Sequence, residues 1–291
     1  MVTIKNPSAV SCKKACLQLT TGLFLLFTTY NICHAQEWKQ EKGDHFIVFY
    51  LTEATQPKEV IRKAEFYYNR IAEDLGYARY SNFWQWEKRV KIFIHPSQEA
   101  FQAATGQPVW SHGMASYFDK SIHSIQTNEK FLDSILPHEI AHLVFRDFVG
   151  FRGQVPLWMD EGVAQWEEDA KRKDALAVMP ELVAGGDVFT LETLMTLDIR
   201  SESDPRKVGL FYTQSISLVD FLIRTFGPAA FTEFCRGLRD GKSVVSALRA
   251  AYPDSLTSVD DMENRWRKYL RGQREASSQE APAQLKTTLT S

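Results

Sequence analysis

The first half of the chain alternates apolar runs of strand length with one amphipathic segment of helical period. Residues 45–50 and 90–94 are rich in β-branched and aromatic side chains, and Pro96 follows the second run. Between them, residues 58–75 repeat apolar positions at helical spacing and stop before Gly76. This order of strand, helix and strand predicts a mixed α/β lobe.

Two further elements complete the predicted lobe. Residues 97–105 have a short helical pattern that Gly106 ends. Residues 114–118 and 122–127 are β-like runs joined by residues 119–121, and they are expected to form a hairpin. The sheet of this lobe is therefore expected to be small.

The second half of the chain follows the helical period almost throughout. Helices are predicted at residues 135–149, 157–166, 170–184 with an interruption at Pro180, 191–197, 210–222, 231–238, 244–251 and 259–270. Residues 201–206 are loop-like, and the polar residues 272–291 are expected to be disordered. The pattern predicts an α+β protein with an α/β lobe at about 36–130 and a helical lobe at about 131–271.

A pair of histidines in the first of these helices carries the strongest chemical signal. His138 and His142 lie four residues apart, so they share one helical face and can direct ring nitrogens at a point about 2 Å away, the usual zinc to nitrogen distance. Glu139 lies about 100° further round the helix. There it can take a proton from a water molecule in the site, which is the chemistry of the H-E-x-x-H pattern.

The flanking residues favour a metal site. Ser134 is a candidate helix cap, and Pro137 is tolerated in the first turn. A catalytic zinc needs a third protein ligand and keeps a fourth position open. Glu161, in the middle of the short helix predicted at 157–166, is the candidate third ligand. Gln165, one turn later, is a candidate hydrogen-bond partner for one of the histidines.

The motif resembles that of the gluzincin metallopeptidases. His-Glu-Ile-Ala-His is followed by eighteen residues and then by the Glu of Trp-Met-Asp-Glu-Gly-Val-Ala, which is similar to the peptidase MA-like branch of that family. The resemblance spans roughly the second half of the chain and implies a zincin-like fold. It also implies that His138, His142 and Glu161 bind Zn²⁺ and that Glu139 is the general base.

The resemblance assigns roles to the hairpin and to one tyrosine. Gluzincins lay the substrate backbone on an edge strand ahead of the zinc helix, an instance of strand addition. Related aminopeptidases have Gly-x-Met-Glu-Asn there, and the Glu binds the free amine. This chain has Gly-Met-Ala-Ser at residues 113–116, so endopeptidase activity is expected instead. Tyr212, whose apolar surroundings also suit a core residue, is the candidate donor to the oxyanion.

The remaining histidines and one cysteine are expected to be structural. His45 and His95 stand at strand ends without a ligand spacing. His112 and His123 flank the hairpin, where contact with a substrate oxygen is the alternative. Cys235 lies in an apolar helical pattern that is typical of a core residue.

The N-terminal segment differs in kind from the rest. Three lysines precede an uncharged apolar stretch at residues 15–32, and the small residue Ala35 follows. This order predicts a signal peptide over residues 1–35 with cleavage after Ala35. An uncleaved anchor is the alternative, although polar residues dilute the stretch. A secreted or periplasmic protein without a stable membrane anchor is expected.

Composition narrows the possible partners. With 44% hydrophobic and 24% charged residues the composition is that of an ordinary globular protein. Removal of residues 1–35 takes away three of the 34 basic residues and none of the 36 acidic ones, which leaves a net charge of about −5 and argues against nucleic acid as a partner. It also leaves Cys235 as the single cysteine, so the mature chain is expected to have no internal disulfide.

Together these features predict a zinc metallopeptidase that acts on a peptide or protein substrate. A binding or envelope-assembly protein that keeps the zincin fold with little catalysis is the alternative. A helical domain with a coincidental motif is the third possibility, which the spacing to Glu161 disfavours.

Overall fold

The computed structural model describes residues 37–52, 55–77, 84–126, 129–151 and 155–288. Contacts divide the chain into Met1–Gln36 and Glu37–Ser291, and the described residues all belong to the second unit. The predicted signal peptide and its cleavage site lie outside the described residues. Every helix that is described is too short or too polar to traverse a lipid bilayer.

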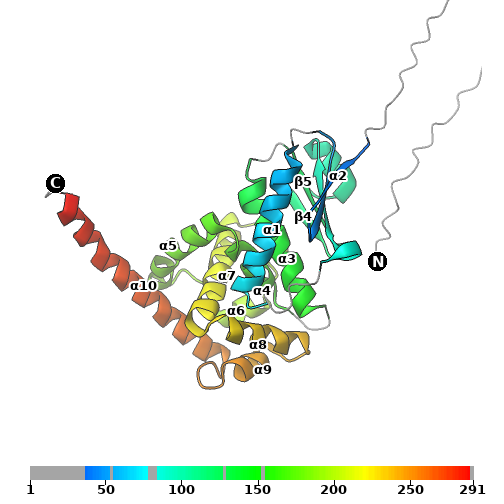
Figure 1. The fold of residues 1–291 in the computed structure, drawn as a ribbon. Coiled ribbons are helices and arrows are strands. Elements are labelled where there is room, and N and C mark those ends of the chain that lie inside the picture. The colour runs from blue at the N-terminus through cyan, green and yellow to red at the C-terminus, as the bar shows by residue number, and fades with distance from the viewer. Residues whose placement is uncertain (1–36, 53–54, 78–83, 127–128, 152–154, 289–291) are drawn as a thin grey trace, which may run out of the picture. The chain divides into compact units, whose positions relative to one another are not determined.

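Five strands form one mixed sheet in the order β1-β2-β3-β5-β4 (Figure 1). They are β1 (Lys39–Lys42), β2 (Phe46–Tyr50), β3 (Val90–His95), β4 (Gly113–Ser116) and β5 (Ser121–Ile125). The three central strands run parallel, and β1 and β4 pair antiparallel with them at the two edges. The predicted strands and hairpin are present, and β4 has an edge position.

Strand β1 is not evident from the sequence. Its four residues are Lys, Gln, Glu and Lys, which lack the alternation of a half-buried strand, and they are mostly exposed. Charged residues on an edge strand discourage pairing with a second chain. The strand is therefore specified by its pairing with β2 rather than by its own hydrophobic pattern.

Two helices pack against the sheet and each other. Helix α1 (Pro57–Asp74) contacts β1 and β2, and α3 (Leu136–Val149) contacts α1 and β4. Inward side chains of the central strands, such as Val48, Ile92 and Ile122, join one buried core with these helices. This packing fixes α3 beside the edge strand β4.

The short helix that precedes the hairpin in the chain begins and ends close to the residues that the sequence predicts. Helix α2 (Gln98–Thr105) begins where Ser97 accepts a hydrogen bond from the Ala100 amide. It ends at Gly106, whose φ of 70° is easily adopted by glycine.

The rest of the described chain is helical, which confirms the α+β class. The helices are α4 (Leu157–Trp166), α5 (Asp169–Gly185), α6 (Leu191–Thr196), α7 (Pro205–Phe226), α8 (Pro228–Arg239), α9 (Val244–Ala251) and α10 (Val259–Thr288), with short helical turns η3 (Trp86–Lys88), η4 (Phe131–Ile135) and η5 (Ile199–Ser201). Helix α4 packs closely on α7 because Gly162 has no side chain. A Cβ there would lie 2.9 Å from the backbone oxygen of Ser215.

Three helices differ from the sequence prediction. Helix α5 continues through Pro180, since one proline removes a single helical hydrogen bond and buried Met179 holds the helix on the core. Helix α7 begins at Pro205, inside the predicted loop, because Asp204 caps it by accepting from the Arg206 amide. Helix α10 reaches Thr288, where disorder is predicted. Gln, Arg, Glu and Ala between residues 273 and 281 favour a helix, which continues through Pro282.

Candidate metal centre and active site

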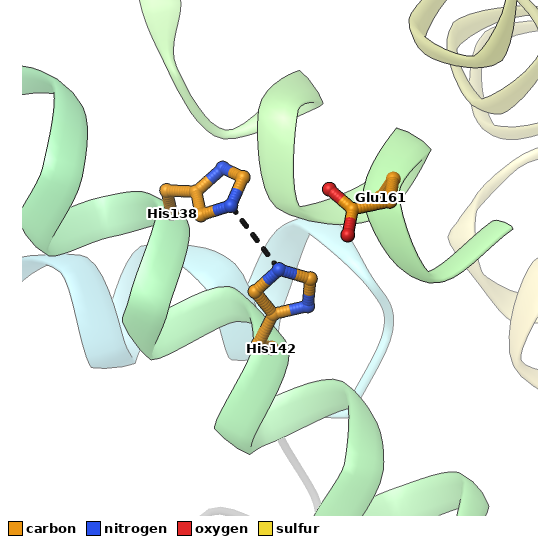
Figure 2. A group of neighbouring side chains, drawn as sticks. All are labelled: His138, His142 and Glu161. Carbon is orange, nitrogen blue, oxygen red and sulfur yellow. Dashed lines mark hydrogen bonds between the residues drawn. The ribbon is translucent and has the colours of Figure 1, made fainter. Parts of the chain in front are cut away.

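Helix α3 presents the two histidines of the H-E-x-x-H motif on one side. The helical turn η4 leads directly into α3, and Pro137 occupies the first turn, as predicted. The Nε2 atoms of His138 and His142 face each other at 3.1 Å, and their ring planes are nearly perpendicular (Figure 2). The i, i+4 spacing thus produces the expected convergence of two imidazoles.

Glu161 reaches the same point from α4. One ligand atom from each of His138, His142 and Glu161 lies within 4.8 Å of the other two, and the carboxylate faces the rings in Figure 2. Glu161 adjoins Gly162, the residue at which α4 packs closely on α7. The three residues predicted to bind metal are therefore brought together from two separate helices.

Two carboxylates orient the imidazoles. The Nδ1 atom of His138 lies 2.9 Å from Glu168 Oε1, and that of His142 lies 3.2 Å from Asp160 Oδ1. When both rings are neutral, each Nδ1–H donates to its carboxylate, so each Nε2 keeps a lone pair. The two lone pairs then point at the space that Glu161 also faces.

This donor set fits a divalent metal. Two imidazole nitrogens and one carboxylate oxygen are the ligands of many catalytic zinc sites. Two facing lone pairs at 3.1 Å repel each other unless a proton or a cation lies between them. Burial lowers the pKa of His142, but Asp160, Glu161 and Glu139 outweigh it and raise the pKa to about 9. The same carboxylates favour a bound cation.

Basic side chains hold the two carboxylates that orient the histidines. Arg146 donates to Asp160 Oδ2 at 2.6 Å and 3.1 Å. Burial opposes ionisation of Asp160, but hydrogen bonds from His142 and Arg146 lower its pKa to about 2. Lys171 donates to Glu168 at 2.8 Å. Both orienting groups are therefore held as carboxylates.

Ser134 and Gln165 do not have the roles that the sequence predicts. The hydroxyl of Ser134 donates to Glu168 instead of capping α3. A cap is not needed, because η4 continues the helix upstream and Phe131 accepts the hydrogen bond of the Leu136 amide. Gln165 lines the cavity but bonds to neither imidazole among the described residues, since Glu168 and Asp160 occupy both Nδ1 positions.

Glu139 is buried between α3 and the edge strand β4. A Cβ added to Gly113 would lie 2.9 Å from Glu139 Oε1 and 2.3 Å from Ile135 Cγ2, so the strand can approach only because residue 113 is glycine. Burial raises the pKa of Glu139, while the nearby histidines and the Ala115 amide oppose this shift. A carboxylate of raised pKa in this position can accept a proton.

Tyr212 shares a cavity with these residues. The cavity has a volume of about 800 Å³ and is lined by His138, Glu139, Glu161 and Tyr212 among others. Burial and the charge of Glu161 raise the pKa of the phenol to about 12. Tyr212 therefore keeps its proton at neutral pH and can donate a hydrogen bond into the cavity.

Of the other histidines that the structure describes, His45, His95 and His123 lie away from the cavity. The ring of His45 lies 2.6 Å from Glu65, and His95 Nε2 lies 3.0 Å from His123 Nδ1. His123 is thus engaged within the sheet. His112 is exposed and lines the cavity. Cys235 is fully buried in the core, as expected.

Asp160 and Glu168 are the functional residues that sequence reasoning missed. Part of a signal was present, because Asp160 adjoins Glu161 on α4. Glu168 lies beyond the end of α4 and directly before α5, so helical periodicity does not relate it to Glu161. Which carboxylate faces which ring depends on how α4 and the start of α5 pack against α3 and η4.

The fold and the site together define a metallopeptidase-like protein. It has a mixed sheet, an H-E-x-x-H helix beside the edge strand of that sheet, and a distal Glu on a second helix. Comparison with protein families matches residues 77–272 to the Peptidase MA superfamily. This match covers more than half of the chain, so the protein belongs to the Peptidase MA superfamily and is a peptidase by family. Comparison with curated proteins finds no match.

Proposed function

We propose that the protein is a zinc-dependent endopeptidase that acts outside the cytoplasm. The observation that carries this proposal is the convergence of His138, His142 and Glu161 within 4.8 Å, with Glu139 beside them at the edge strand. Membership of the Peptidase MA superfamily supports the hydrolysis of peptide bonds.

Zinc is the metal that best suits the donor set. A site of two imidazoles and one carboxylate suits zinc, whereas calcium and magnesium prefer sites made of oxygen. When bound, the metal would make a water molecule more acidic and would polarise the carbonyl of the scissile bond. His138, His142 and Glu161 would hold it.

The side chains around the metal have separate tasks. Glu139 takes a proton from the attacking water and delivers it to the leaving nitrogen. Tyr212 donates a hydrogen bond to the oxygen on which negative charge develops. Glu168 and Asp160 keep the Nδ1 protons of His138 and His142, which leaves each Nε2 available as a ligand.

Endopeptidase activity is supported by the edge strand. Strand β4 has the sequence Gly-Met-Ala-Ser and offers no acidic side chain for the free amine of a peptide. Its outer edge is not paired with another strand in the part of the chain that the structure describes. An internal segment of a polypeptide can therefore lie along it.

The location rests on the sequence. The order of lysines, apolar stretch and Ala35 supports export to the periplasm or the medium. A chain that retains residues 1–35 after expression with an export pathway would contradict this part of the proposal.

Hydrolysis of casein and of quenched peptides tests the activity. The purified wild-type protein should cleave them, 1,10-phenanthroline should stop cleavage, and added zinc should restore it. Glu139→Gln should retain metal and lose cleavage. A wild-type protein that binds zinc but cleaves neither substrate would favour a binding or envelope-assembly role.

A further inference from the structure

Large aromatic side chains are exposed at both ends of the edge strand β4. Trp110 precedes the strand and is 79% exposed, and Phe118 follows it and is 99% exposed. Phe151, which is 65% exposed, follows α3 and belongs to the same end as Phe118. Exposed apolar side chains that gather in one region of a protein surface mark contact sites.

The loop that carries Trp110 is held in place. The side-chain amide of Gln98 donates to the backbone oxygens of Val109 at 3.1 Å and Ser111 at 2.9 Å, one on each side of Trp110. Trp110 also lines the cavity that contains His138 and Glu139. The indole is therefore presented at the His138 end of the site by a fixed backbone.

The turn that carries Phe118 is held in a similar way. Lys120, at the end of the β4–β5 turn, forms an ion pair of 2.6 Å with Asp147 on α3. Next to Phe118, the Tyr117 ring packs edge to face on Phe151, with ring centroids 5.4 Å apart. Phe118 follows Tyr117 in the chain and is exposed beside this pair. We call Tyr117, Phe118 and Phe151, at this end of β4, the aromatic platform.

The platform lies on the His142 side of the site. The guanidinium of Arg146 lies 5.7 Å from the centre of the Phe151 ring, and Arg146 also binds Asp160, the partner of His142. Trp110 and the platform therefore flank the two metal-binding histidines from opposite sides. Between them lies β4, whose outer edge has no strand partner among the described residues and can pair with a substrate backbone.

We infer that the cleft takes an extended polypeptide segment with bulky apolar side chains on both sides of the bond that is cleaved. The inference rests on the proposed function and names its substrate class, which is unfolded polypeptide. Folded proteins bury such side chains, whereas unfolded chains expose them together with free backbone groups. Because Trp110 and Phe118 stand on pinned turns, little ordering is needed when the substrate binds.

A lipid surface is the other partner that exposed aromatic residues suit. It is disfavoured because the two aromatic groups flank a strand edge that offers backbone hydrogen bonds, and lipid tails cannot use them. Peptide contacts use both features at once.

Matched peptides test the inference. One internally quenched peptide of about twelve residues, or ~40 Å when extended, has Leu-Phe pairs near both ends, and the other has Ser in their place. The wild-type protein should cleave the apolar peptide with a KM about tenfold lower, which corresponds to about 1.4 kcal/mol of binding. Trp110→Ser and Phe118→Ser should each raise the KM for the apolar peptide about fivefold and should reduce its preference over the Ser peptide.

Two control variants replace exposed apolar side chains that lie away from the cavity. Trp86 is 80% exposed and Val178 is 47% exposed, and neither lines the cavity around His138. Trp86→Ser and Val178→Ser should leave both KM values unchanged. Equal KM values for the two peptides with the wild-type protein would overturn the inference, as would site variants that behave like the controls.

Direct binding separates this inference from the proposed function. Fluorescence anisotropy with the labelled apolar peptide and Glu139→Gln protein reports affinity without cleavage, and Trp110→Ser in that background should weaken it about fivefold. Peptide binding without wild-type hydrolysis would refute the proposed activity alone.

Sedimentation with vesicles of phosphatidylcholine and phosphatidylglycerol tests the lipid alternative. If Trp110→Ser and Phe118→Ser weaken this sedimentation while peptide affinity is unchanged, the surface is a lipid contact and the inference fails.

Discussion

Glu168 accepts a hydrogen bond from Nδ1 of His138 at 2.9 Å and thereby turns the Nε2 of that ring toward His142. Glu168 also receives hydrogen bonds from Ser134 and Lys171. The buried carboxylate, directly before α5, thus links the start of α5 to α3 and to the preceding turn η4. It positions a ligand without facing the metal itself.

Removal of this link should weaken metal binding. Glu168→Ala frees the His138 ring to rotate and removes the acceptor of its Nδ1 proton, so zinc affinity should fall by about 10-fold to 100-fold. Competition with a zinc-sensitive chelating dye measures the change. Lys171→Ala is the control, because it removes a half-exposed partner of Glu168 and should change affinity much less. An unchanged affinity in Glu168→Ala would show that other contacts fix the ring.

The sequence predicts the part of this site that depends on local geometry. The spacing of His138 and His142 on one helix is enough to bring their rings together. Glu161 is predicted because a catalytic zinc needs a third protein ligand and Glu161 is an acid in the middle of the next short helix. The positions of Asp160 and Glu168 could not be predicted, because they depend on how α4 and the start of α5 pack against α3 and η4. The resemblance to gluzincins supports Glu161 as the third ligand, but it does not predict the carboxylates that orient the two histidines.

Two glycines also show that tertiary packing cannot be predicted from local sequence patterns. Gly113 and Gly162 occur in runs without turn signals, so the sequence gives no reason for glycine there. The structure supplies one, since each residue lies where a Cβ would come within 3 Å of another element. Close approach between elements distant in sequence is a tertiary property. Strand β1 is a similar case, because its pairing with β2 and not its own pattern makes it a strand.

The approach of β4 to Glu139 should be needed for catalysis. Gly113→Ala places a methyl group 2.9 Å from Glu139 Oε1, so either the carboxylate or the strand must move. The expected result is a fall in kcat of at least about tenfold, since misplaced catalytic groups lose rate steeply. Metal content should be unchanged. Steady-state kinetics and metal analysis on the same preparation measure both.

Gly209→Ala is the matched control for this substitution. Gly209 lies in α7, and a Cβ there would meet no atom within 4 Å. Replacement should raise the free energy of unfolding by up to about 1 kcal/mol through helix propensity and leave kcat unchanged. If Gly113→Ala and Gly209→Ala have equal kcat values, β4 does not constrain Glu139.

Tyr212 should contribute to the reaction through its hydroxyl. Tyr212→Phe keeps the ring that packs against the core and removes one hydrogen-bond donor from the cavity. Loss of a donor to a developing oxyanion typically costs about 100-fold in kcat. KM and the melting temperature should change little. Wild-type turnover in Tyr212→Phe would return Tyr212 to a packing role.

The pair His95 and His123 should make the protein sensitive to acid. Burial and the facing ring of His123 lower the pKa of His95 from 6.5 to about 4. The folded state therefore binds fewer protons than the unfolded state between these values, so stability falls as the pH drops from 6.5 to 4. The loss is at most about 3 kcal/mol for this group.

Urea unfolding at several pH values checks this sign. His95→Phe should flatten the decrease of the free energy of unfolding between pH 6.5 and 4. His112→Gln replaces an exposed ring and serves as the control. An equally steep decrease in His95→Phe and the wild-type protein would mean that other groups cause the acid sensitivity.

Metal content measured by inductively coupled plasma mass spectrometry tests the central claim most directly. The wild-type protein and Glu139→Gln should each contain about one zinc ion per chain, because Glu139 is not a ligand. Glu161→Ala, which removes one of three converging donors, should contain much less after dialysis. Full zinc occupancy in Glu161→Ala, or none in the wild-type protein after incubation with zinc, would contradict the account.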